Sequence, residues 1–169
     1  MNGGSIMNYT ISIGITIGVL AGILVSLAES LNVLSWVCIV SWALYYASGA
    51  GVEGLKKTLA ANVTGVIYGF IIVWGAGILG FPYALGVMVA IFAFLMCAQA
   101  HISILSFIPG AFCSAAAYFG AGAKPEVFVA VAISLVLGTV LGFVSDIAAK
   151  SIMKKEKPTV SNKSSNSSS

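Results

Sequence analysis

Polar side chains that could line a path through a membrane stand beside long apolar runs at two places in the chain. Glu29 and Asn32 follow the first apolar run, and Gln99, His101 and Ser103 stand between two later runs. Histidine changes its charge between pH 5 and 8, so His101 could gate a path or relay protons. The plainer interpretations are a helix-end carboxylate that reaches water for Glu29 and a water-exposed interfacial imidazole for His101. These residues are candidates for lining a solute path.

Pro109 and Gly110 stand inside the fifth apolar run. Proline removes one backbone donor and clashes with the preceding helical turn, while glycine adds backbone freedom. The pair therefore predicts a kink or break in the middle of a helix. Freed carbonyls in lipid must face protein or a water-filled cavity. Pro109 and Gly110 are further path-lining candidates, with a plain packing kink as the alternative.

Enzyme chemistry is not indicated by any residue pattern in the chain. It has one His and no Arg, and no nucleophile stands in a known arrangement with a base. The cysteines, Cys38, Cys97 and Cys113, each lie inside an apolar run without the spacing of a metal site. We therefore expect no enzyme activity, no metal and no cofactor, and we interpret the cysteines as packing residues.

The composition places the chain in a membrane. Hydrophobic residues make up 59% and charged residues 8% of the sequence, and the mean hydropathy of +1.05 is too high for a soluble domain of 169 residues. The positive charge lies mainly in Lys56–Lys57 and in the tail that begins at Lys150. The net charge of +3 therefore reflects orientation in a membrane, and no nucleic-acid partner is expected.

Six apolar runs can be interpreted as transmembrane helices, because about 20 apolar residues cross about 30 Å of hydrocarbon. With six crossings both termini lie on one side, and the Lys-rich tail predicts that this side is the cytoplasm. Lys56 and Lys57 then form a cytoplasmic loop, with Asn62 as a possible N-cap of the next helix. The expected spans are 11–28, 33–50, 63–79, 83–100, 102–119 and 127–147.

The membrane part of the sequence is repeated. Leu34-Ser35-Trp36 matches Leu105-Ser106-Phe107 and Gly49-Ala50-Gly51 matches Gly120-Ala121-Gly122, both at a displacement of 71 positions. A third match, from Gly65–Phe70 to Gly138–Phe143, has a displacement of 73. Because each repeat has three crossings, the second repeat enters the membrane from the opposite side and is inverted relative to the first. Channels and transporters use this arrangement. The alternative is that duplication simply makes a stable, symmetric bundle.

Two glycine pairs mark helix faces that can approach closely. Gly65 with Gly69, and Gly138 with Gly142, stand four residues apart, the spacing of a close helix–helix contact. Such faces could join the two halves or join subunits. Asp146 stands four residues before Lys150, as in an ordinary exposed ion pair, so no transport role is assigned to it.

The segment from Trp36 to Gly51, with its pair Tyr45-Tyr46, and the glycine-spaced third and sixth runs carry a resemblance to a known family. The chain resembles the uncharacterised bacterial inner-membrane family that includes YcdZ, proteins of similar size grouped as a domain of unknown function. The resemblance implies a location in the bacterial inner membrane and supplies no substrate or site residues.

The expected protein is an all-α integral membrane protein with both termini in the cytoplasm. Its expected parts are an N-terminal segment (1–8), two inverted three-helix repeats (9–79 and 80–149) and a disordered Lys/Ser-rich tail (150–169). The favoured function is a channel or facilitator for a small neutral or weakly ionised solute, and the alternative is a scaffold that binds partner helices. Six short helices leave little interior and a large apolar perimeter, so the chain is also a candidate homo-oligomer in the bilayer.

Overall fold

The computed structural model describes residues 3–155, with side-chain environments for 9–152. Within this range the protein is all-helical. Residues 3–155 form six α-helices, with two short 3-10 turns between the fourth and fifth helices. They are α1 (Gly3–Leu27), α2 (Ser35–Ala47), α3 (Gly51–Leu79), α4 (Ala84–Ala98), η1 (Gln99–His101), η2 (Ser103–Leu105), α5 (Ile108–Gly120) and α6 (Pro125–Lys155).

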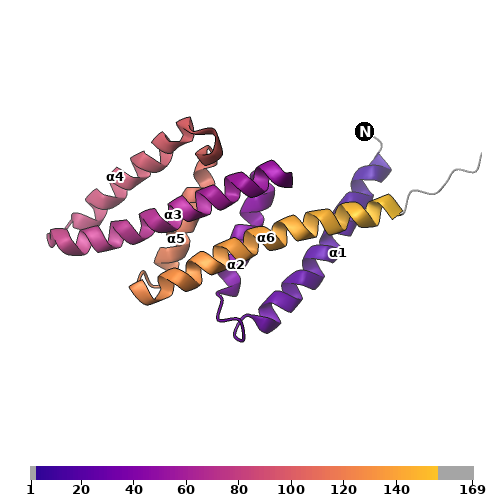
Figure 1. Ribbon diagram of the computed structural model, residues 1–169, viewed down its shortest axis with the longest axis horizontal. Helices are drawn as coiled ribbons and strands as arrows, with labels where there is room; N and C mark the ends of the chain where they lie inside the picture. Colours follow the sequence, from indigo (N-terminus) through magenta and orange to yellow (C-terminus); the bar gives the residue numbers. More distant parts are fainter. Residues whose placement is uncertain (1–2, 156–169) are drawn as a thin grey trace, which may run out of the picture.

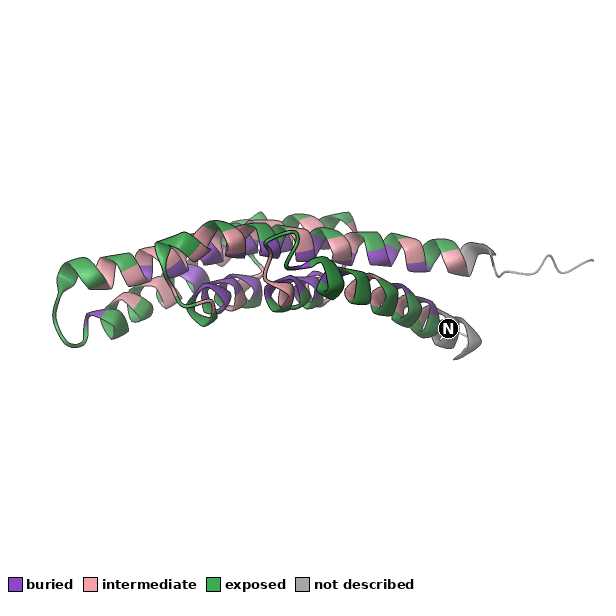
Figure 2. Ribbon diagram, turned by 90° about the horizontal axis from the view of Figure 1, so that it is seen from below, coloured by how far each residue is buried: buried purple, intermediate pink, exposed green. Residues whose placement is uncertain are grey.

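The two longest helices form the middle of the bundle. α3 and α6 lie side by side and run in opposite directions along the long axis (Figure 1). α2 and α1 pack against α6, while α5 and α4 pack against α3. Figure 2 shows a flat molecule whose buried residues lie between two layers and whose outer surfaces are exposed. The exposed side chains on those surfaces are largely apolar, as expected for contact with lipid.

The two short helices end in the same way. α2 and α5 each contain 13 residues, and each is followed by a glycine and an alanine with positive φ. Gly49 and Ala50 have φ of 103° and 55°, and Gly122 and Ala123 have φ of 100° and 53°. This turn pairs Gly49 with Gly122 at a displacement of 73, whereas the sequence match paired Gly49 with Gly120.

Glycines bring α3 onto α5 and α6 onto α2 at backbone distance. A Cβ at Gly65 would overlap the carbonyl oxygen of Ala111, and a Cβ at Gly138 would overlap that of Cys38. One turn further along α3, a Cβ at Gly69 would lie 3.2 Å from the Cα of Ala115. These close contacts join helices of residues 9–79 to helices of residues 80–149 within one chain.

The start of α3 differs from the expectation. The helix begins at Gly51, directly after the positive-φ turn, so Lys56 and Lys57 are helical and the expected loop there is wrong. Residues 52–62 contain no proline, and Lys57 pairs with Glu53 at 3.5 Å across one turn of the exposed helix face. Asn62 is consequently a buried residue of the helix interior and not an N-cap.

Pro109 does not kink the middle of a helix. It stands in the first turn of α5, where the missing backbone N–H leaves no helical hydrogen bond unmade. The preceding segment, 99–107, forms η1, η2 and their connections, so the helix expected from residue 102 begins only at Ile108.

Both expected terminal segments are partly helical. Residues 3–8 belong to α1, and residues 150–155 belong to α6, so disorder throughout 150–169 is wrong for its first six residues. The rest of the expected tail, 156–169, lies outside the described residues.

Among the described residues, four helices are long and apolar enough to cross a membrane. They cover Tyr9–Leu27, Gly51–Leu79, Ala84–His101 and Pro125–Ile152. α2 is apolar but has 13 residues, a length of about 20 Å against about 30 Å of hydrocarbon. α5 has the same length.

Candidate functional site

Four polar side chains meet where α2, α3, α5 and α6 come together. Each helix contributes one member of this central polar cluster: Ser41, Asn62, Ser114 and Thr139. All four residues are at most 1% exposed. Ser41 and Ser114 are the middle residues of their 13-residue helices.

Asn62 holds the central polar cluster together. Its Nδ2 donates to Ser41 Oγ and to Thr139 Oγ1, both at 2.8 Å, and its Oδ1 accepts from Ser114 Oγ at 2.8 Å. The hydroxyls of Ser41 and Thr139 lie 2.7 Å apart and both reach the carbonyl of Leu135, at 2.5 and 2.9 Å. Buried polar groups with full hydrogen bonding are tolerated in an apolar interior. The cluster carries no charge, so it suits hydrogen bonding to a neutral group.

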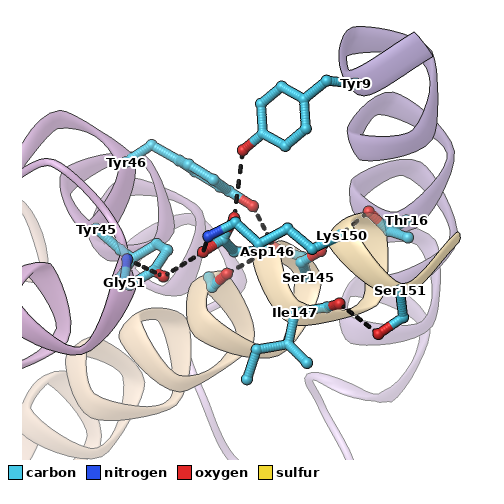
Figure 3. A network of polar contacts seen from close by, with 11 residues as sticks. Tyr9, Thr16, Tyr45, Tyr46, Gly51, Ser145, Asp146, Ile147, Lys150 and Ser151 are labelled. Atoms are coloured by element: carbon cyan, nitrogen blue, oxygen red, sulfur yellow. Dashed lines mark hydrogen bonds and ion pairs between the residues drawn. The ribbon is translucent and has the colours of Figure 1, made fainter. Parts of the chain in front are cut away.

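A second polar group surrounds Asp146 on α6, at the end of the bundle where α3 begins. Its carboxylate accepts hydrogen bonds from Tyr9 OH on α1 at 3.2 Å and Tyr45 OH on α2 at 3.1 Å, and pairs with Lys150 Nζ at 2.6 Å (Figure 3). Tyr45 OH also accepts from the backbone N–H of Gly51 at 2.7 Å. We call Tyr9, Tyr45, Asp146 and Lys150 the Asp146 cluster. It ties α1, α2 and the α2–α3 turn to α6.

Ser145 extends this polar region toward the central polar cluster. Trp42 Nε1 donates to Ser145 Oγ at 3.0 Å, and Tyr46 OH lies 2.6 Å from the same oxygen. Thr16 on α1 reaches the Ser145 carbonyl at 3.4 Å. Ser145 stands six residues beyond Thr139, a rise of about 9 Å along α6. Polar groups therefore follow α6 from its middle to Lys150.

Asp146 is buried, in contrast to the exposed ion pair expected from sequence. The expected pair with Lys150 is present, but Lys150 has a side chain 57% exposed whereas that of Asp146 is 1% exposed. The sequence signal was a lone carboxylate inside an apolar helix, which marks a functional candidate in a membrane protein. Its other partners, Tyr9 and Tyr45, are 137 and 101 positions away, so spacing alone did not reveal them.

The residues selected from sequence as path-lining do not form a single site. Glu29 and Asn32 are exposed in the α1–α2 connection. His101 and Ser103 are exposed between α4 and α5, and Pro109 is exposed in the first turn of α5.

Gln99 and Gly110 are the buried members of the sequence-selected set. The carboxamide of Gln99 has no hydrogen-bond partner among the described residues. Gly110 packs against Ala61 and Phe107, where its Cβ would lie 2.8 and 2.6 Å from their nearest atoms. Its carbonyl accepts from Ser114 Oγ at 2.8 Å, which links Gly110 to the central polar cluster.

The described residues contain no group of three or more His, Cys, Asp or Glu side chains that could hold a metal ion. Cys38 is buried, Cys113 half-buried and Cys97 exposed, and none of these three thiols is in a disulfide.

Comparison with known proteins places the chain in a family without an assigned function. Residues 14–150 match the model of a family described as "Protein of unknown function (DUF1097)". The chain belongs to the DUF1097 family.

Two curated relatives of the chain carry the name of an inner membrane protein. The chain is 38% identical over 135 residues to "Inner membrane protein YcdZ" of Escherichia coli strain K12, covering 78% of this chain and 83% of the relative. The protein of the same name in Salmonella typhimurium strain LT2 is 36% identical over 135 residues, covering 78% and 84%. "Uncharacterized protein YahC" of E. coli K12 is 25% identical over 158 residues, covering 90% and 94%. No solved structure matches the chain. The family resemblance expected from sequence is confirmed.

Proposed function

We propose that this DUF1097 protein is a facilitator that passes a small neutral or weakly ionised solute across the bacterial inner membrane. The observation that carries the proposal is the central polar cluster, in which α2, α3, α5 and α6 each place one uncharged polar side chain at the same point. A solute with hydroxyl or amide groups can exchange hydrogen bonds with Ser41, Asn62, Ser114 and Thr139 without the cost of moving a charge.

The proposed architecture is two inverted three-helix repeats. Three features recur at a displacement of 73: the turns at Gly49 and Gly122, the mid-helix serines Ser41 and Ser114, and the glycines Gly65 and Gly138. The partners recur as well, because Gly65 faces Ala111 and Gly138 faces Cys38, which are themselves 73 positions apart. Repeats of three helices enter a membrane from opposite sides, and inverted repeats commonly place a substrate path at their junction.

The proposed topology has six crossings and both termini in the cytoplasm. Tyr45 contacts both Gly51 and Asp146, so the start of α3 and the end of α6 share one end of the bundle. Lys56, Lys57 and Lys150 belong to these helix ends, and positive charge favours the cytoplasmic side.

The proposed facilitator has no enzymatic activity.

Stopped-flow light scattering on proteoliposomes tests the proposal directly. The full-length protein is challenged with glycerol, urea, acetate and ammonium salts, and a solute-selective acceleration over empty liposomes is expected. Ser41→Ala and Ser114→Ala should reduce that acceleration, whereas Ser26→Ala is the matched control, because Ser26 is exposed and bonds to Gly22 of its own helix. Traces equal to those of empty liposomes for every solute, with folded protein present, would reject the facilitator.

Gly110→Leu is not a suitable variant for this assay. The side chain would meet Ala61 and Phe107, so a loss of flux would report altered packing.

A scaffold function is the second candidate, favoured by the outer face of α1. Gly14, Gly18 and Gly22 stand one turn apart with nothing within 4 Å of a Cβ at any of them. A hollow of about 460 Å³ runs along this face, lined in part by Gly18, Gly22 and Ser26. Small residues at this spacing let a partner helix approach closely. Gly18→Leu should abolish recovery of a partner if the protein is a scaffold, and it should leave solute flux unchanged if the protein is a facilitator.

A further inference from the structure

The carboxylate of Asp146 is the one buried acidic group among the described residues. Glu29, Glu53 and Glu126 are all exposed, whereas Asp146 is 1% exposed. An ionisable side chain inside a membrane-spanning helix is costly and is by default a candidate for function. The groups that contact Asp146 indicate which function this side chain has.

Each contact of Asp146 comes from a different part of the bundle. Tyr9 belongs to α1, Tyr45 to α2 and Lys150 to α6, and Tyr45 is in turn bound by the N–H of Gly51 at the α2–α3 turn. These contacts match an ionised carboxylate, because both tyrosine hydroxyls and the ammonium group donate to it. Lys150 is the charged group in contact with Asp146, and the tyrosines are the other titratable groups that contact it.

We propose that Asp146 is a proton-binding site whose protonation loosens α1 and α2 from α6, and that solute movement along the proposed path is thereby linked to protons. The inference rests on the proposed function for the solute, but the proton site can be tested without it. A proton from water adds to one carboxylate oxygen, and Lys150 keeps its own proton. The ion pair is lost, and the protonated oxygen becomes a donor facing the hydroxyls that donated to it.

The other repeat indicates that the fold does not need this carboxylate. At the displacement of 73, Val73 corresponds to Asp146 and Tyr118 to Tyr45. Val73 and Tyr118 belong to an apolar cluster in which Phe70 and Phe128 each lie 6.1 Å or less from a neighbouring ring. Apolar packing therefore holds the equivalent helices, α3 and α5, together without a buried carboxylate. Because burying a charge costs free energy, stability alone does not explain why Asp146 is present on α6.

Tyr45 connects the proton site to the proposed path. Its Cβ lies 2.9 Å from the position of a Cβ at Gly142, so the Tyr45 ring fills the space that this glycine leaves open. The Gly142 carbonyl accepts from Ser145 Oγ, which is also bound by Trp42. A displacement of Tyr45 would change how α2 packs against the part of α6 that lies between Asp146 and the central polar cluster.

The first test measures protonation and helix packing in the same sample. The full-length protein in lipid nanodiscs is titrated between about pH 2 and 9, a range that extends well to both sides of the ordinary Asp value of about 3.9. Infrared spectroscopy follows the carboxyl C=O stretch, and fluorescence follows Trp42 in a Trp36→Phe, Trp74→Phe background. We expect one component of the carboxyl signal to share its midpoint with the Trp42 signal. That component and the Trp42 change should both vanish in Asp146→Asn, while the carboxyl signals of the exposed glutamates Glu29, Glu53 and Glu126 remain.

Two further variants separate a proton site from a structural ion pair. Lys150→Gln should move the shared midpoint to higher pH, because the cation that favours the ionised carboxylate is removed. Asp146→Glu should still show a pH-dependent change in the infrared and Trp42 signals, because a carboxyl group is kept at this position. Glu126→Gln is the control, because Glu126 is exposed and its change should leave the Trp42 transition unaltered. A Trp42 signal that does not change with pH, or that changes equally in Asp146→Asn, would overturn the inference.

Flux measurements distinguish a failed proton site from a failed facilitator. With any solute that the proteoliposomes pass, flux should fall about tenfold for each pH unit above the midpoint, following the protonated fraction. Flux independent of pH and unchanged in Asp146→Asn would overturn the inference and leave the facilitator standing. A shared titration without any solute flux would support the proton site and reject the facilitator.

Discussion

Ser41 and Ser114 occupy the midpoints of α2 and α5 and bind opposite ends of one side chain, the carboxamide of Asn62. The two serines are 73 positions apart, yet one amide group joins them across α3. Asn62 therefore connects the two short helices of the bundle. Removing its carboxamide should weaken the packing of both α2 and α5.

Asn62→Leu should lower the free energy of unfolding by about 1–3 kcal/mol, because the hydroxyls of Ser41, Ser114 and Thr139 lose their shared partner. Thermal unfolding in detergent, followed by circular dichroism, measures the loss. Thr64→Val is the control on the same helix, since Thr64 bonds only to carbonyls of α3 itself at Ala60 and Ala61. Equal stability of the two variants would contradict the role of Asn62.

Gly138→Ala should be destabilising by about 1–3 kcal/mol, because its Cβ would overlap the carbonyl of Cys38 and force α6 away from α2. Gly77→Ala is a matched helical control with nothing within 4 Å of the new Cβ. It should be neutral or stabilising by up to about 1 kcal/mol, since alanine is the better helix former. The comparison uses the same unfolding assay. Equal melting temperatures would show that α2 and α6 can separate without cost.

Tyr45→Phe should weaken the end of the bundle near Lys150, because the hydroxyl serves both Asp146 and the Gly51 N–H. We expect a loss of about 1–3 kcal/mol, since two buried groups lose a partner. Hydrogen exchange measured by mass spectrometry should show faster exchange at the start of α3. Tyr83→Phe, at a residue 80% exposed, should behave like the unchanged protein. Unaltered exchange in Tyr45→Phe would mean that the hydroxyl is dispensable.

The proposed six-crossing topology predicts which side of the membrane each connection faces. In a background with Cys38, Cys97 and Cys113 replaced by alanine, Asn32→Cys and Lys124→Cys should react with an impermeant maleimide added outside intact spheroplasts. Lys57→Cys and Ser103→Cys should react only after permeabilisation. Labelling of Asn32→Cys and Lys57→Cys from the same side would reject the crossing of α2.

Most of the helical framework could be predicted from sequence because apolar run length and helix-breaking residues are local signals. The run at 83–100 corresponds closely to α4, the run at 11–28 ends with α1 although that helix begins at Gly3, and the turn after α2 carries its glycines in the sequence. The start of α3 differs from the prediction because two adjacent lysines, Lys56 and Lys57, favour a loop in an otherwise apolar sequence. Charged side chains on an exposed helix face can be paired within the helix, as Lys57 and Glu53 are.

The candidate site could not be predicted in the same way. Ser41, Ser114 and Thr139 are ordinary small polar residues in apolar runs, and what marks them as a site is their contacts with residues 21–98 positions away. Sequence patterns favour instead the polar residues near run ends and the pair Pro109-Gly110. Of this set, only Gln99 and Gly110 are buried.

Composition and run length were sufficient to indicate an apolar, helical membrane protein, because hydropathy and helix length are additive along the chain. Burial is not additive, since it depends on which helices face one another. Packing of α1 and α2 onto α6 removes Asp146 from water while leaving Lys150, four residues away, 57% exposed. The same packing gathers four polar residues from four helices around Asn62, because glycines such as Gly65 and Gly138 let the backbones approach.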